Sequence, residues 1–165
     1  MSAQALLHSL FKYKAWANEE LFAECAKIDP KVHQSERHAA IRLLNHIYVV
    51  DRIFAAHLSG DRHNYSGTNT PETPSFEELR TAVAESDSWY IEYVGRMSPE
   101  ILQEMVKFTF TDGAPGCMSR EEMLAHVATH GDYHRGAVGR IMPQLSVPPF
   151  TEYLHKADPR RRKHS

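Results

Sequence analysis

Four stretches of the chain repeat apolar residues at intervals of three and four positions, the spacing that places side chains on one face of a helix. In the second stretch this apolar stripe consists of Leu43, Ile47, Val50, Phe54 and Leu58. The spacing predicts helices over residues 3–27, 35–59, 75–96 and 119–141. Because each stretch is polar on its other side, each helix must bury its stripe against the others.

Residues that favour helix ends flank these stretches. Ser35 is the expected N-cap of the second helix, and Gly60 is its expected C-terminal stop. In a capping box, a serine precedes a glutamate by three positions, and each satisfies a backbone amide of the first turn. Such boxes open the third and fourth helices at Ser75 with Glu78 and Ser119 with Glu122.

A different period appears between the third and fourth helices. Val106, Phe108 and Phe110 alternate with polar residues, and Asp112-Gly113 follows them as a turn signal. The alternation predicts a small extended segment or hairpin. Together with the four helices it indicates an all-α protein, an antiparallel four-helix bundle with a small extended or hairpin insertion before the last helix.

The length of 165 residues suits a single domain, which we assign to residues 1–157. Net charge is −2, so no global field favours nucleic acid, and we expect no nucleic-acid partner. "RRRK" at 160–163 is the exception. We expect residues 158–165 to be a basic, disordered tail, and a nucleic-acid-binding arm is the alternative.

Features of targeting are missing from the sequence. The N-terminal residues carry charge early and include no long apolar run, and no segment approaches the roughly 20 apolar residues of a membrane span. Cys25 and Cys117 lie far apart and form no CxxC motif, which favours reduced thiols. We therefore expect a soluble, cytoplasmic protein without a membrane partner.

Three histidines, His126, His130 and His134, lie four residues apart in the fourth helix. A step of four residues leaves two side chains about 40° apart in azimuth and about 6 Å apart along the axis, close enough to chelate one metal ion. The outer two differ by about 80° and about 12 Å. One adjacent pair can therefore bind an ion, and the spacing alone does not choose between 126/130 and 130/134.

The pair does not belong to an HExxH motif, because Gly131 stands where that motif has its glutamate. Asp132 cannot replace the glutamate, since it lies about 200° round the helix from either neighbouring histidine. A third ligand is available in His46, which flanks the apolar stripe of the second helix with Leu43 and Val50. Neutral imidazoles suit zinc, nickel, copper or iron, and three of them leave a position open for water or substrate.

Other polar residues are assigned structural or peripheral roles. We expect surface or second-layer positions for His8, His33, His38, His57, His63, His155 and His164. Asp51 lies about 140° round the helix from His46, which favours a salt bridge or a helix–helix contact. Arg42, Asn45 and Tyr48 are close to His46 in sequence and are candidates for orienting a substrate.

With these residues identified, the chain resembles the DinB-like (YfiT-like) family of metal-binding four-helix bundles. "YKAWANEELF" at 13–22, "LLNHIYVVDRIF" at 43–54 and "LAHVATHGDYHRGAVGRIM" at 124–142 match its helix motifs, in order and spacing. The prolines at 148–149 fit the usual sequel. The likeness extends over roughly residues 4–155.

The resemblance implies that His46, His130 and His134 form a metal triad and that His126 lies one turn away from the ion. Many family members have glutamine after the HRG motif, whereas this chain has Ala137, so a polar neighbour of the site is absent. Despite the family's name, the resemblance implies neither DNA binding nor polymerase activity. It also implies a homodimer, with the first and last helices as the usual contact.

Characterised relatives include thiol-dependent transferases and isomerases, in which a divalent metal binds and deprotonates a low-molecular-weight thiol. Zinc, nickel or iron in this site would lower the pKa of a bound thiol or water in the same way. The expected function is that of a metal-dependent hydrolase or thiol S-transferase acting on a small molecule. The alternative is a non-catalytic, metal-stabilised structural or binding protein. No carboxylate lies one turn from the three histidines, so no catalytic residue is assigned.

Overall fold

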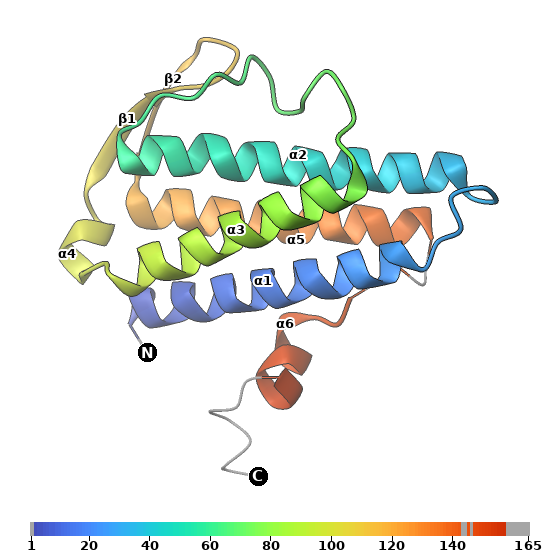
Figure 1. Ribbon diagram of the computed structural model, residues 1–165. Coiled ribbons are helices and arrows are strands. Elements are labelled where there is room, and N and C mark those ends of the chain that lie inside the picture. Colours follow the sequence, from blue (N-terminus) through green and yellow to red (C-terminus); the bar gives the residue numbers. More distant parts are fainter. Residues whose placement is uncertain (1, 143–144, 146, 158–165) are drawn as a thin grey trace.

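The structure is a computed structural model that describes residues 2–142, 145 and 147–157. Four long helices lie side by side (Figure 1), and two strands form a hairpin beyond the ends of α2 and α5. The long helices are α1 (Ala3–Ala26), α2 (Gln34–Ser59), α3 (Phe76–Gly95) and α5 (Arg120–Ile141). The prediction of a mostly helical protein with a small hairpin before the last long helix is confirmed.

The helices pack in two antiparallel pairs, α1 with α3 and α2 with α5. Gln4 at the start of α1 donates a hydrogen bond to the carbonyl of Val94 at the end of α3 (3.1 Å). Arg120 at the start of α5 likewise donates to the carbonyl of Leu58 near the end of α2 (2.6 Å). By contrast, α2 and α3 run in the same direction, because the connection over 60–75 crosses back along the molecule (Figure 1).

Helix ends follow the local signals at most positions. In the capping box of α5, Ser119 Oγ accepts from the Glu122 amide (3.2 Å) and Glu122 Oε2 accepts from the Ser119 amide (2.7 Å). Ser75 caps α3 by accepting from the Glu78 amide. Gly60 ends α2 with φ of 75°, a left-handed conformation that glycine adopts without the steric cost of a Cβ.

The predicted N-cap of α2 is wrong. The helix begins at Gln34 after His33, so Ser35 lies inside it, and its hydroxyl donates to Glu36 Oε2 at 2.9 Å. The preceding turn sets this entry, because the His33 amide already donates to the Asp29 carbonyl (2.9 Å). Backbone hydrogen bonding has thus begun before the chain reaches the serine.

The hairpin consists of β1 (Met105–Thr109) and β2 (Pro115–Ser119), which pair antiparallel with Phe108 opposite Gly116. The short helix α4 (Pro99–Leu102) precedes it and is capped by Ser98. After α5, the chain forms α6 (Phe150–Glu152) and a π-helical stretch (Tyr153–Ala157), neither of which the periodicity predicts. Tyr153 of this segment packs on Tyr13 and Trp16 of α1, which anchors the segment to the bundle.

The bundle core contains two apolar clusters. One includes Phe11, Phe54 and Tyr90, and the other includes Leu21 and Leu44. Along α1, and likewise along the other long helices, the residues of one cluster give way to those of the other. A layer of buried polar side chains occupies the level between them; its members are Lys14, Asn18, Asp51, Asp87 and Arg135.

Ion pairs and hydrogen bonds connect all four helices within this polar layer. The Lys14 ammonium contacts Asp51 Oδ2 (2.5 Å) and Asp87 Oδ1 (2.7 Å). The side-chain amide of Asn18 donates to the second oxygen of Asp87 (2.7 Å), and Arg135 donates to the side-chain oxygen Oδ1 of Asn18 (3.0 Å). Asp51 thus has the structural ion pair that its position on α2 predicted. Burial costs each of these groups its hydration, so they are stable there only as a set.

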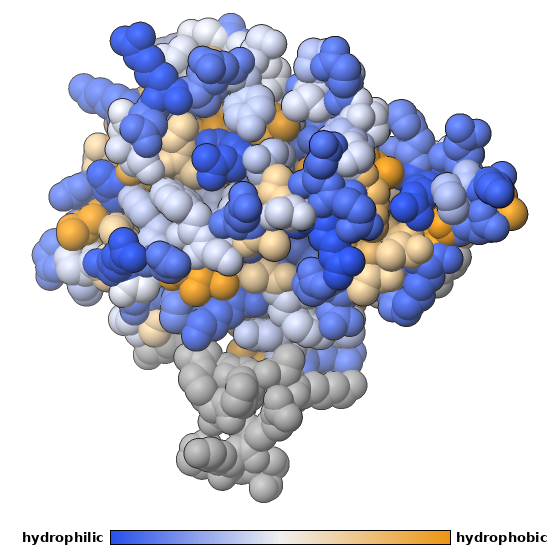
Figure 2. All heavy atoms as spheres, in the orientation of Figure 1, coloured by the Kyte–Doolittle hydropathy of each residue, from blue (hydrophilic) through white to orange (hydrophobic). Residues whose placement is uncertain are grey.

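The outer surface is predominantly hydrophilic on the face shown in Figure 2, where apolar residues form small separate patches. Along residues 2–142, 145 and 147–157, none of the helices combines the length and apolar character that crossing a bilayer requires. The basic stretch at 158–165, for which disorder was expected, lies outside the described residues.

Candidate metal centre

Three imidazoles from two helices converge beside the polar layer. His46 of α2 faces His130 and His134 of α5, and the ring centroids of His46–His134 and of His130–His134 are each 4.5 Å apart. Nε2 of His46 is 3.1 Å from Nε2 of His130. One ring nitrogen from each of the three lies within 4.8 Å of the other two. Of the two histidine pairs that the spacing left open, the structure joins 130/134 to His46.

These distances agree with the geometry of a metal ion held by imidazoles. Zinc–nitrogen bonds of about 2.0–2.1 Å in a tetrahedral site place two nitrogen ligands about 3.3 Å apart. The separation of 3.1 Å between the His46 and His130 nitrogens is close to that value. The three histidines could therefore hold one ion if His134, whose ligand nitrogen lies within 4.8 Å of the other two, completes the same spacing.

The orientation of His46 is set by the connection between α2 and α3. Its Nδ1 lies 2.7 Å from the carbonyl oxygen of Thr68, which can only accept, so Nδ1 carries the proton and Nε2 keeps its lone pair. That lone pair points to His130 and His134. A backbone carbonyl bound to the other ring nitrogen is the usual support of a metal-binding histidine, because it fixes both the tautomer and the ring plane.

Two residues of α2 hold this connection in place. Arg42 donates to the carbonyl of Thr70 (2.8 Å), and the buried Asn45 donates to Thr70 Oγ1 (2.7 Å) and to the side chain of Asn69. Asn69 in turn donates to the Arg42 carbonyl (3.0 Å). These contacts occupy the side chains of Arg42 and Asn45, which were candidates for orienting a substrate. They act instead on the segment that carries Thr68.

The pKa values of the two α5 histidines are lowered. Burial, together with the neighbouring His134 and His46, lowers the pKa of His130 to about 3. Burial and His46 also lower the pKa of His134. The neutral imidazole is the form that binds a metal, so these shifts favour the metal-binding form of both residues.

The other residues of α5 around His130 and His134 have partners of their own. The His126 ring lies 5.5 Å from that of His130 and stacks on Phe54 (4.7 Å), so it is next to the triad and not part of it. Asp132 points outward, as its azimuth predicted, and pairs with Arg135. Gly131 is buried against α1: a Cβ there would lie 3.3 Å from Cε of Lys14, so packing explains the absence of a side chain.

A family model described as the DinB family matches residues 1–163. The chain belongs to the DinB family. Protein DinB of Bacillus subtilis (strain 168) is 21% identical to it over 145 residues, which cover 82% of this chain and 83% of that protein. A comparison with solved structures gives no significant match. The family that the three helix motifs suggested is thus confirmed.

In this DinB-family chain an apolar cavity of about 330 Å³ adjoins the triad. It lies between α2, the hairpin and α5, and Thr68 closes one side. Its lining consists of His46, Val50, Ile53, Phe54, His57, Thr68, Phe108, Phe110, Thr111, Met118, His126 and His130. Sequence reasoning missed the part played by the hairpin, although the alternation of Phe108 and Phe110 with polar residues showed that one hairpin face is apolar.

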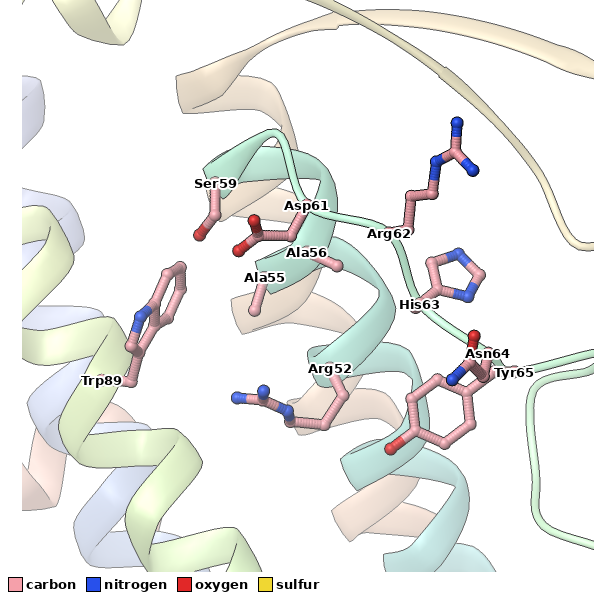
Figure 3. Close-up of a pocket in the computed structure, with 10 residues that line it drawn as sticks. All are labelled: Arg52, Ala55, Ala56, Ser59, Asp61, Arg62, His63, Asn64, Tyr65 and Trp89. Atoms are coloured by element: carbon pink, nitrogen blue, oxygen red, sulfur yellow. The ribbon is translucent and has the colours of Figure 1, made fainter.

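A second, polar cavity of about 740 Å³ lies on the other side of α2 (Figure 3). Arg52 extends across it toward Trp89 of α3, and Asp61 lies near its upper end. Ala55 in its floor is nine residues beyond His46, about half a turn round the helix. This cavity is therefore separate from the triad, and the two cavities differ in chemistry: charged residues line one and uncharged residues the other.

Proposed function

We propose that this DinB-family protein binds one divalent metal ion, zinc, nickel or iron, through His46, His130 and His134 inside a four-helix bundle. The observation that carries the proposal is the convergence of three imidazoles on one point. Three features support it: the spacing of the His46 and His130 nitrogens, the carbonyl that orients His46, and the lowered pKa of His130 and His134.

The set of ligands at the site favours a catalytic metal site over a purely structural one. Among residues 2–142, 145 and 147–157, no aspartate, glutamate or cysteine joins the three histidines. Structural zinc sites are usually closed by four protein ligands, whereas catalytic sites have three and leave a position open. A set of three histidines, two of which line a cavity, fits the second description.

The proposed activity is that of a thiol S-transferase or hydrolase acting on a small molecule, as the resemblance to thiol-dependent relatives suggests. A bound ion would lower the pKa of a thiol or water placed on it and so supply the nucleophile. The chain's own residues orient the site and exclude water. Thr68 holds His46 in position, and the hairpin covers the cavity next to the imidazoles.

The proposal is tested by measuring the metal content of protein purified without an affinity tag. We expect about one equivalent in the wild type. His46→Ala and His130→Ala each remove a ligand and should lose most of the metal. His126→Ala is the matched control, because it removes an imidazole from the same stripe one turn away, and it should keep the metal. Near-equal metal in wild type and both ligand variants would refute the triad.

Activity is then measured as conjugation of several low-molecular-weight thiols to electrophilic acceptors, with the zinc, nickel and iron forms compared. Turnover that disappears with His46→Ala supports the transferase. A protein that binds metal yet turns over no thiol and hydrolyses no ester or amide would instead be the non-catalytic, metal-stabilised alternative.

For the assembly, we propose a homodimer with α1 and α5 at the contact. Two exposed side chains on these helices support it, since Leu6 is 44% and Tyr133 is 76% exposed. Sedimentation of wild type and Tyr133→Asp measures the oligomeric state. The absence of nucleic-acid and membrane partners and a cytoplasmic location stay predictions from the sequence.

A further inference from the structure

We propose that the molecule acted on at the triad carries an uncharged, apolar group that fills the cavity between α2, α5 and the hairpin. This inference rests on the proposed function, because it takes the triad as the reacting end of the site. It adds the substrate class: the cavity binds the apolar acceptor, and the hydrophilic thiol lies outside it.

The lining supplies the first argument. The residues round the cavity include no aspartate, glutamate, lysine or arginine. Burying a charged group without a partner costs several kcal/mol or more, so a carboxylate or ammonium of a ligand has no side chain to compensate that cost in the part of the cavity away from the triad. Complementary side chains for a charged ligand occur in the polar cavity, where Arg52 and Asp61 lie.

Aromatic contacts supply the second argument. Phe108 of β1 lies at the centre of the wall, with ring centroids 4.9 Å from both His57 and Phe110 and 6.0 Å from Phe54. Flat rings at these distances offer edges and faces to another ring. Gly116 opposite Phe108 makes this arrangement possible, because a Cβ there would lie 2.6 Å from the Phe108 ring.

Size and position supply the third argument. A volume of about 330 Å³ equals that of roughly ten water molecules at about 30 Å³ each, which leaves room for a bicyclic aromatic compound. His46 and His130 belong to the lining, so a group in the cavity has one end at the triad. An apolar acceptor bound there would present its reactive atom to whatever the imidazoles hold.

Two probes that differ only in charge test the inference. Naphthalene and 2-naphthalenesulfonate are titrated into zinc-treated wild type and into chelator-treated protein, with binding followed by probe fluorescence. Since the cavity lining offers no counter-charge and the chelator removes any ion, we expect chelator-treated protein to bind naphthalene at least about tenfold more tightly than the sulfonate.

Variants of the hairpin locate the binding. Phe108→Ala removes the central ring and should weaken naphthalene binding about tenfold. Lys107→Ala is the matched control, since it precedes Phe108 on β1 and lies on the exposed face, and it should bind as the wild type does. Phe110→Ala serves as a second variant in case Phe108→Ala destabilises the hairpin, because Phe110 is 43% exposed. Circular dichroism checks the fold of each.

The outcomes separate the two proposals. Equal or tighter binding of the sulfonate by chelator-treated protein, or naphthalene binding that neither phenylalanine variant weakens, would overturn the apolar cavity as a substrate site. Protein that selects naphthalene but retains no zinc would overturn the metal centre alone. Selective naphthalene binding by chelator-treated protein, reduced by the Phe108 change and not by the Lys107 change, together with zinc retained by zinc-treated protein, is the result expected.

Discussion

Lys14 carries a buried ammonium group that forms ion pairs with two carboxylates. Its side chain is 1% exposed and contacts Asp51 and Asp87 from α2 and α3. Burial by itself lowers a lysine pKa, but the two carboxylates outweigh it and raise the pKa of Lys14, so the residue stays charged. One side chain therefore links three helices.

Replacing this ammonium should be costly. We expect Lys14→Met to lower the free energy of unfolding by about 3–5 kcal/mol, because it leaves two buried carboxylates without a counter-charge. Lys27→Met is the control: Lys27 is 69% exposed in its pair with Glu24, and such surface pairs contribute at most about 1 kcal/mol. Urea unfolding measures both. Similar losses for the two variants would contradict the account of the polar layer.

At the scale of a single element, two of the three glycines of α5 have opposite surroundings. A Cβ on Gly131 would lie 3.0 Å from an Arg135 nitrogen and 3.3 Å from Cε of Lys14, and ion pairs hold both of those side chains in place. A Cβ on Gly136 would meet nothing within 4 Å. The helix is thus close to α1 at one glycine and open at the other.

This contrast predicts opposite effects of the same substitution. Gly136→Ala should raise the free energy of unfolding by about 0.5–1 kcal/mol, which is the difference in helix propensity. Gly131→Ala gains the same propensity but crowds Lys14 and Arg135, and we expect a net loss of about 1–3 kcal/mol. Thermal unfolding in the presence of a chelator compares the two without any contribution from metal. Equal stabilisation by both would show that α1 and α5 are not closely packed at Gly131.

At the scale of the whole molecule, the polar layer couples stability to pH. Burial raises the pKa of Asp51 to about 6, with Asp87 adding to the effect and Lys14 opposing it. In the unfolded chain the group returns to its ordinary value of 3.8. Between these values the folded state binds more protons than the unfolded state, so the free energy of unfolding falls as pH rises.

A comparison of wild type with Asp51→Asn subtracts the contribution of acids outside the polar layer. The unfolding free energy of wild type minus that of the variant should fall by up to about 3 kcal/mol as pH rises from below 4 to above 6. Denaturant unfolding at a series of pH values measures it. A difference that is constant with pH, or that grows, would contradict the raised pKa.

The sequence alone predicted what depends on neighbours along the chain. The serine caps at Ser75 and Ser119, the Gly60 stop and the hairpin follow from hydrogen bonds and steric limits within a few residues, although the reciprocal capping box forms at Ser119, whereas the Glu78 carboxylate accepts from the Ser75 hydroxyl. The azimuth of Asp132 follows from helix geometry in the same way. These forces act over short separations, so the order of residues suffices to predict them.

Tertiary structure decided which distant residues meet. The spacing of His126, His130 and His134 was equally compatible with two candidate ligand pairs, because the position of α5 relative to His46 depends on packing. The family resemblance favours the second pair, and the structure places that pair beside His46. The carbonyl of Thr68, the cavity wall formed by Phe108 and the parallel course of α2 and α3 likewise left no local signal. Contacts across 84 residues, as between His46 and His130, arise only when whole helices pack, since their free energy comes from burial and not from local propensity.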